Sequence, residues 1–197
     1  KRAAEQLEAL GHHVEAAFPA ALADAEFGRK FSALWSTNMG VGIARIGEQL
    51  GREITADDVE LVNGAQAQFA RSFSGVDYAQ ALAANVTYRR AIQQWWADGW
   101  DLLVTPTLGE PPAPIGTFAN NLEQPMAPMI RAGAYVPSTP AFNSSGQPAI
   151  SLPLHWTADG LPVGVQLVAA YAREDLLFRV ASQLEQAMPW ADRRPPL

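Results

Sequence analysis

The segment from residue 149 to residue 170 constrains the fold more than any other part of the chain. Two nearly continuous apolar runs, AISLPL at 149–154 and VGVQLVAA at 163–170, lie on either side of Asp159-Gly160. Short apolar runs of this kind are typical of strands that are covered on both faces. Asp-Gly favours a tight turn between two strands. The sequence therefore predicts two buried strands joined by a turn.

The remaining periodic segments predict an α/β protein. Apolar residues recur at helical spacing in several stretches, and the predicted helices cover 2–10, 22–50, 57–73, 74–98 and 173–187. Short runs ended by Gly or Pro predict further strands at 12–16 and 101–105. Residues 108–140 are rich in proline and show no sustained period, so we predict a long ordered loop with one short helix near 128–132.

Two polar clusters mark expected helix starts. Thr55 is followed by two acidic residues, and Ser74 precedes Asp77, as in N-terminal caps whose carboxylates lie in the first turn. The helix predicted at 22–50 also contains Gly40, Gly42 and Gly47. These glycines indicate either a break in that helix or close packing against a neighbour.

Composition and charge exclude several classes of protein. The chain has 197 residues, of which 48% are hydrophobic, enough for one sizeable core and one domain. Its formal charge of −6 argues against a nucleic-acid partner. No apolar run of 18 residues is present, so no membrane partner is expected. Cysteine is absent, which excludes disulfides and thiolate chemistry and is consistent with the cytoplasmic location that we predict.

The residues that could perform chemistry do not form a recognisable active site. His12, His13 and His155 have no partners at ligand spacing, so we predict no metal and no cofactor. The serine pair Ser144-Ser145 lacks the G-x-S-x-G context of a nucleophile elbow. A Ser-Lys mechanism needs a buried lysine, and the only two lysines are at the first residue and on an exposed helical stretch. We therefore predict that residues 143–146 form a tight loop before a strand.

The C-terminal phrases of the sequence resemble those of a known enzyme family. FNSSGQPAISLP at 142–153 and GLPVGVQ at 160–166 are similar to the FNxxGxPAxSxP and GLPxGxQ phrases of the amidase signature family. WDLLVTPT at 100–107 resembles the strand before that family's proline-rich loop, and AAEQLEALGHHVE at 3–15 resembles its mid-chain helix and strand. The matching residues are Phe142, Asn143, Gly146, Pro148, Ala149, Ser151, Pro153, Gly160, Leu161, Pro162, Gly164 and Gln166.

The resemblance implies a fold and a domain organisation. Residues 1–197 would be the C-terminal fragment of a single amidase domain, an α/β/α sandwich with a mixed sheet flanked by helices. Within it, 22–100 would be mainly helical, and 101–190 would hold strands, the long proline-rich loop and a closing helix. The helical region also resembles bacterial amidases of the aminohexanoate-cyclic-dimer hydrolase type.

The same resemblance implies hydrolysis of a carboxylic amide by a Ser–cis-Ser–Lys triad. That triad belongs to a GGSSGG-like signature and an upstream lysine, and neither is present in this sequence, so no catalytic residue is assigned here. The expected ligand of the full-length enzyme is a small amide, and a homodimer is left open. Two alternatives are a non-catalytic binding or assembly module and a fragment of an amidotransferase A-type subunit.

The resemblance also places the acyl pocket beside the residues that precede and begin the FNxxGxPA phrase. These residues are small, apolar or aromatic, which suits a linear aliphatic acyl chain better than a charged one. The predicted pocket residues are Gly133, Tyr135, Val136, Pro140, Phe142 and Asn143.

Overall fold

The structure, a computed structural model, describes residues 1–195 as an α/β protein with two compact units. The sheet unit consists of residues 1–23, 89–113 and the chain from 135 onward. The helical unit consists of residues 24–88 and 114–134. The single amidase domain that the resemblance implies remains a prediction.

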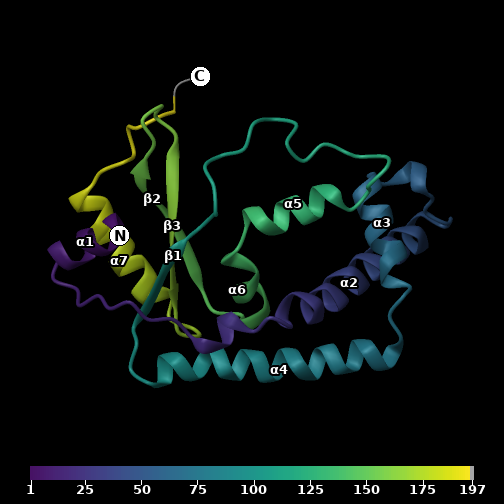
Figure 1. Ribbon diagram of the computed structural model, residues 1–197, viewed down its shortest axis with the longest axis horizontal. Helices are drawn as coiled ribbons and strands as arrows, with labels where there is room; N and C mark the ends of the chain where they lie inside the picture. Colours follow the sequence, from purple (N-terminus) through teal and green to yellow (C-terminus); the bar gives the residue numbers. More distant parts are fainter. Residues whose placement is uncertain (196–197) are drawn as a thin grey trace. The chain divides into compact units, whose positions relative to one another are not determined.

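The sheet unit contains three antiparallel strands in the described residues, in the order β1-β3-β2. They are β1 (Leu102–Pro106), β2 (Ala149–Trp156) and β3 (Pro162–Ala169). Strands β2 and β3 form the predicted hairpin (Figure 1), and Thr157 N–H donates to the Leu161 carbonyl at 2.9 Å beside its turn. Asp159 and Gly160 lie in that turn, where Gly160 adopts a φ of 81°. The prediction of two apolar strands joined at Asp-Gly is confirmed.

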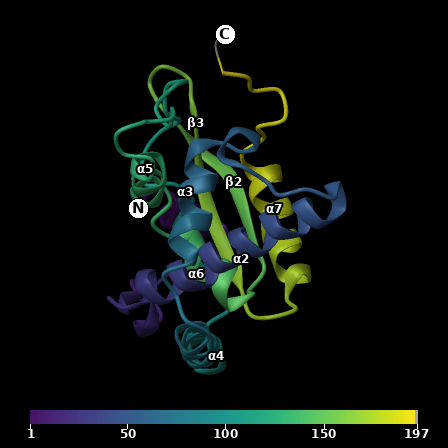
Figure 2. The same ribbon diagram turned by 90° about the vertical axis from the view of Figure 1, so that its right-hand side faces the viewer.

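Two helices pack on one face of this sheet and form its hydrophobic core. They are α1 (Arg2–Ala9) and α7 (Glu174–Ala187), and α7 lies alongside β2 and β3 in both ribbon views (Figures 1 and 2). Both helices have a pronounced apolar stripe, which is buried against the sheet. The buried core residues are Leu7, Leu152, Leu154, Leu167, Ala169, Leu177, Val180, Ala181 and Leu184.

The helical unit is built around α2 (Phe27–Leu50) and α3 (Leu61–Ala70). α2 is continuous, so its glycines do not break it, and two of them, Gly40 and Gly47, lie close to neighbouring atoms. A Cβ at Gly40 would lie 3.5 Å from the Ala70 Cβ, and one at Gly47 would lie 2.9 Å from the Arg52 carbonyl oxygen. The unit also contains the first turns of α4 (Gly75–Ala97) and most of α5 (Ala127–Tyr135).

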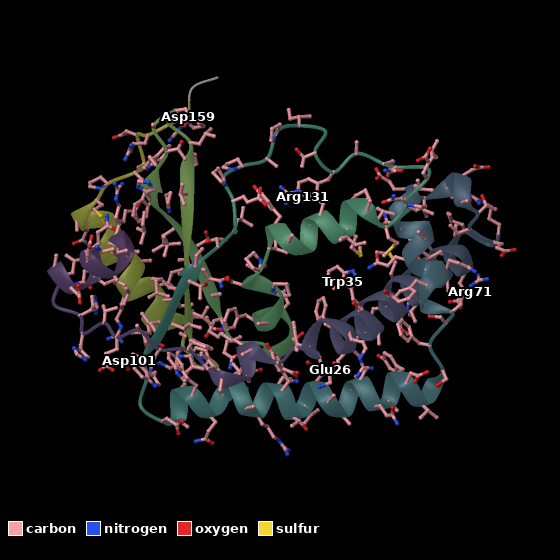
Figure 3. All side chains as sticks on the ribbon, viewed as in Figure 1. Glu26, Trp35, Arg71, Asp101, Arg131 and Asp159 are labelled. Atoms are coloured by element: carbon pink, nitrogen blue, oxygen red, sulfur yellow. The ribbon has the colours of Figure 1, made fainter. Side chains whose placement is uncertain are left out.

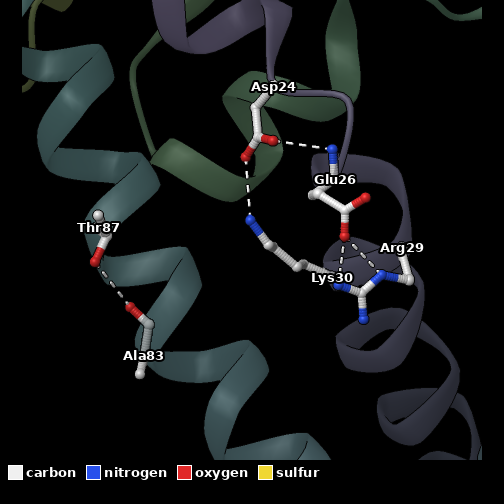
Figure 4. A network of polar contacts seen from close by, with 6 residues as sticks. All are labelled: Asp24, Glu26, Arg29, Lys30, Ala83 and Thr87. Carbon is white, nitrogen blue, oxygen red and sulfur yellow. Dashed lines mark hydrogen bonds and ion pairs between the residues drawn. The ribbon is translucent and has the colours of Figure 1, made fainter.

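Polar contacts order the start of α2 (Figure 4). Asp24 accepts a hydrogen bond from the Glu26 N–H at 2.9 Å and forms an ion pair with Lys30 Nζ at 3.3 Å. The backbone N–H of Glu26 is the main reason that the pKa of Asp24 is lowered, and Lys30 adds to the effect. Arg29 pairs with Glu26 one turn away. The exposed Lys30 predicted from the sequence is thus half-buried, and its partner is a structural carboxylate.

Helix starts agree with the sequence at one of the two predicted caps. Ser74 and Asp77 form reciprocal hydrogen bonds at the start of α4, as predicted. Thr55 and Asp58 also bond to each other, but they cap a short 3-10 helix, Ala56–Asp58. The α-helix expected from 57 begins only at Leu61, because Val59 and Glu60 are extended.

Two further predictions from the sequence are wrong. Residues 12–16 form no strand, since they pair with none of the three described strands. The tight loop predicted at 143–146 is instead the end of a helix, because residues 143–145 are the last residues of α6 (Thr139–Ser145). Pro140 lies in the first turn of α6, where a missing N–H costs nothing, and Gly146 ends the helix in a left-handed conformation with φ 81°.

Candidate functional site

A row of polar side chains crosses the sheet on the face opposite the α1/α7 core. The register aligns Thr105, Gln166 and Ser151 on neighbouring strands. The buried Gln166 donates through Nε2 to Thr105 Oγ1 at 3.1 Å. Two residues after Thr105, Thr107 lies on the same face, and its Oγ1 is 2.7 Å from Ser151 Oγ. Because side chains alternate between the two faces of a strand, this face is polar where the other is apolar.

Gly164 lies beside the pair of hydroxyl groups and leaves room for it. A Cβ at this position would be 2.8 Å from Ser151 Oγ and 2.9 Å from Thr107 Oγ1. No positive φ is involved, so the requirement for glycine is one of space. Two residues of the GLPVGVQ phrase therefore contribute to this polar row: Gln166 is part of it, and Gly164 leaves space for its hydroxyl groups.

A second polar cluster surrounds the C-terminal end of α6. Arg89 Nε donates to the Ser145 carbonyl at 3.3 Å, and the Arg89 guanidinium also lies beside Gly146. Ser145 is fully buried, and its Oγ has no hydrogen-bond partner among the described residues. Both ends of the Gln147 amide are likewise buried and without a partner in the described part of the chain. Buried groups of this type usually bond to water or to a ligand.

Within the described residues, no base contacts the hydroxyl group of Ser145. A nucleophilic serine needs a base within about 3 Å of its hydroxyl. No such base contacts Ser145 Oγ, and the nearby cation Arg89 is directed at the carbonyl oxygen.

Tyr135 anchors the proline-rich loop that follows β1. Its hydroxyl donates to the Pro111 carbonyl at 2.9 Å and accepts from the Ala113 N–H at 3.1 Å. Its backbone carbonyl accepts from the Gly109 N–H at 3.0 Å. These three bonds hold residues 109–113 against the end of α5. The hydroxyl of Tyr135 therefore has a structural role, and the pocket role predicted for this residue stays a prediction.

The six predicted pocket residues have different environments. Phe142 is buried, Asn143 is exposed, and Tyr135, Val136 and Pro140 are half-buried, all within the sheet unit. Gly133 belongs to the helical unit, where a Cβ would meet no atom within 4 Å. Their role in an acyl pocket stays a prediction. Arg89 and Gln147 were not predicted as site residues. Arg89 reaches Ser145 from 56 positions away in the sequence, so no local pattern links the two.

The histidines have structural partners. His12 Nε2 lies 2.8 Å from Gln183 Oε1, and His155 Nδ1 lies 3.1 Å from Arg2 Nη1. His13 contacts Glu15 at 2.6 Å on the surface. Within residues 1–195, no cluster of three or more His, Cys, Asp or Glu side chains is suited to hold a metal ion. No helix in that range is long and apolar enough to cross a bilayer.

Comparison with known proteins identifies the family. The sequence model of the Amidase family matches residues 1–178. The chain belongs to the amidase signature family. The 6-aminohexanoate-cyclic-dimer hydrolase of Paenarthrobacter ureafaciens is 42% identical over 200 residues, which cover 99% of this chain and 41% of that protein. The acylamidase of Rhodococcus erythropolis is 29% identical over 191 residues, covering 95% of this chain and 38% of that protein.

Solved structures agree with this assignment. The structure of a 6-aminohexanoate cyclic dimer hydrolase matches with a TM-score of 0.89 and 41% identity, covering 98% of this chain and 41% of that one. A complex of such a hydrolase with substrate matches equally well. The chain therefore has the fold of part of an amidase signature protein, and it spans about 41% of the length of these relatives.

Proposed function

We propose that this chain is the C-terminal segment of an amidase that hydrolyses a carboxylic amide to an acid and an amine or ammonia. The observation that carries the proposal is the 42% identity to a 6-aminohexanoate-cyclic-dimer hydrolase along 99% of the chain. Identity along nearly the whole chain, which includes the C-terminal phrases and the helical region, supports a hydrolase of linear or small amides.

Catalysis in this proposal uses a Ser–cis-Ser–Lys triad in a part of the enzyme upstream of Lys1. The second serine attacks the amide carbonyl and forms an acyl-enzyme, while the lysine and the bridging serine take its proton and deliver one to the leaving amine. Backbone N–H groups hold the oxyanion. Water then attacks the acyl-enzyme, and the lysine and the bridging serine take its proton and return one to the attacking serine as the acid leaves.

The segment described here would support that site without supplying a nucleophile. Its strands complete the sheet, and residues 133–143 form part of the wall around the acyl group. The small or apolar character of Gly133, Val136 and Pro140 supports a linear aliphatic acyl chain as substrate. The expected compartment is the cytoplasm.

The test compares the full-length protein with residues 1–197. We expect the full-length protein to release amine from linear aliphatic amides and from the cyclic dimer of 6-aminohexanoate. A Ser→Ala change in its GGSSGG-like signature should abolish release. We expect no turnover by residues 1–197, with or without Ser145→Ala. A full-length protein without that signature and without amide hydrolysis would overturn the proposal in favour of a binding module, and turnover by residues 1–197 would overturn the placement of the triad.

A further inference from the structure

Helix α6 ends against a cation from a distant part of the chain. Arg89, on α4, donates from Nε to the carbonyl of Ser145, the last residue of α6, at 3.3 Å. The Arg89 Nη2 lies 3.8 Å from the position that a Cβ on Gly146 would occupy. Carbonyl groups at the end of a helix lack partners within the helix and carry partial negative charge, so a guanidinium is favourable there. Arg89 thus binds the C-terminal end of α6.

The C-terminal part of α4 is a rigid support for this side chain. Residues 89–97 belong to the sheet unit, as α6 does. Ile92 and Trp96 are buried, and their helical spacing places them on the same face of α4 as Arg89. Residues 98–101 then connect α4 to β1, with Asp101 just before the strand (Figure 3). Burial and this short connection therefore fix Arg89 relative to the sheet.

Helix α6, in contrast, depends on its surroundings for its placement. It has seven residues, whereas an isolated helix needs about 12–15 to be even marginally stable in water. The turn that follows it contains buried polar atoms without partners. In the described residues, Ser145 Oγ and both ends of the Gln147 amide have none. A buried turn that lacks hydrogen bonds is costly, so the bond from Arg89 contributes directly to holding the end of α6 in place.

We infer that Arg89 is a positioning residue for the proposed amide hydrolysis, and that by holding the end of α6 it sets the fit of the substrate's acyl chain. The inference rests on the proposed function. Phe142 and Asn143, two of the predicted pocket residues, lie in the last turn of α6. The Phe142 carbonyl accepts from the Gly146 N–H at 2.9 Å, beside the bond from Arg89 to the neighbouring residue. A shift of the helix end therefore moves both pocket residues.

The kinetic constants of the full-length protein for hexanamide and acetamide test this role. Arg89→Met removes the cation and its donors but keeps a long, unbranched side chain. Arg90→Met is the matched control, because Arg90 is the next residue of α4 and is exposed, with no hydrogen bond or ion pair in the described residues. We expect Arg89→Met to raise KM for hexanamide about tenfold and to leave its kcat unchanged, since an acyl-chain contact acts equally on the bound substrate and the transition state. Both constants for the shorter acetamide, and all constants of Arg90→Met, should stay at the wild-type values.

A purely structural role for Arg89 predicts a different result. Arg89→Met would then reduce the amount of folded enzyme, so kcat would fall equally for both amides while KM stayed unchanged, and this outcome would overturn the inference. Arg89→Lys is the conservative comparison, because it keeps the charge and a donor for a single carbonyl. It should return KM for hexanamide to within about threefold of the wild type, and a KM as high as that of Arg89→Met would contradict the role of the bond. If Arg89→Met does not fold, Arg89→Gln, which is uncharged and shorter, provides the same comparison.

The wild-type protein in the same assay separates the two proposals. Hydrolysis by the wild type, with a KM for hexanamide that Arg89→Met does not change, would refute the role of Arg89 and leave the amidase assignment intact. A full-length wild type that hydrolyses no tested amide would refute the proposed function and, with it, the role of Arg89.

Discussion

Gly164→Ala is the substitution for which the structure gives the sharpest expectation. The new Cβ would lie 2.8 Å from Ser151 Oγ, 2.9 Å from Thr107 Oγ1 and 3.1 Å from Thr107 Cβ. Ser151 can rotate about χ1, but the β-branched Thr107 cannot move both atoms away without shifting its backbone. The hydrogen bond between the two hydroxyl groups, 2.7 Å long, would therefore be strained or lost.

The magnitude follows from three contributions. Overpacking of one methyl group costs about 1–3 kcal/mol, and loss of a hydrogen bond costs about 1 kcal/mol. Alanine also reduces the conformational freedom of the unfolded chain, which stabilises the folded state by about 0.4–1 kcal/mol. We expect a net loss of roughly 2 kcal/mol in the free energy of unfolding, which for a chain of this size lowers Tm by about 4–8 °C.

Chemical denaturation followed by circular dichroism measures this loss, and two comparisons interpret it. Gly42→Ala, on α2 with no atom within 4 Å of its would-be Cβ, should stabilise the chain by up to about 1 kcal/mol. In a Ser151→Ala background, the cost of Gly164→Ala should become smaller, because one of the close contacts is gone. A Gly164→Ala chain as stable as the wild type would refute the reasoning.

Two other predictions concern the core of each unit. Leu184→Ala, at a fully buried position between α7 and the sheet, should lower the free energy of unfolding by about 2–5 kcal/mol, whereas Phe178→Ala on the exposed side of α7 should change it by less than about 0.5 kcal/mol, both read from denaturant midpoints. Burial, with a smaller effect of Asp24, raises the pKa of Tyr88 to about 12. The neutral phenol is thus favoured in the folded state, so its contribution to stability is complete below about pH 10 and is lost as pH rises toward 12. Tyr88→Phe should make unfolding less dependent on pH in this window, and a tyrosinate absorbance titration that shows Tyr88 ionising near pH 10 in the folded protein would contradict this.

Local sequence signals determined the elements that depend on near neighbours. The Asp159-Gly160 turn, the two apolar strands around it and the Ser74 cap of α4 all formed as predicted, because each needs only short-range hydrogen bonds or a simple apolar pattern. The family resemblance was also available from the sequence, since its phrases are contiguous. Short-range chemistry was therefore a sound guide to secondary structure in these segments.

Tertiary structure decided the features that depend on distant partners. Residues 12–16 have a strand-like sequence, but a strand exists only where a neighbour supplies hydrogen bonds, and none of the described strands lies beside them. The roles of Gly40 and Gly47 in α2 were ambiguous until Ala70 and the Arg52 carbonyl proved to be their neighbours. Arg89 meets Ser145 across 56 positions. Pairing and burial join residues that no local pattern links, and for this reason the polar row and the buried Gln147 became visible only in the folded chain.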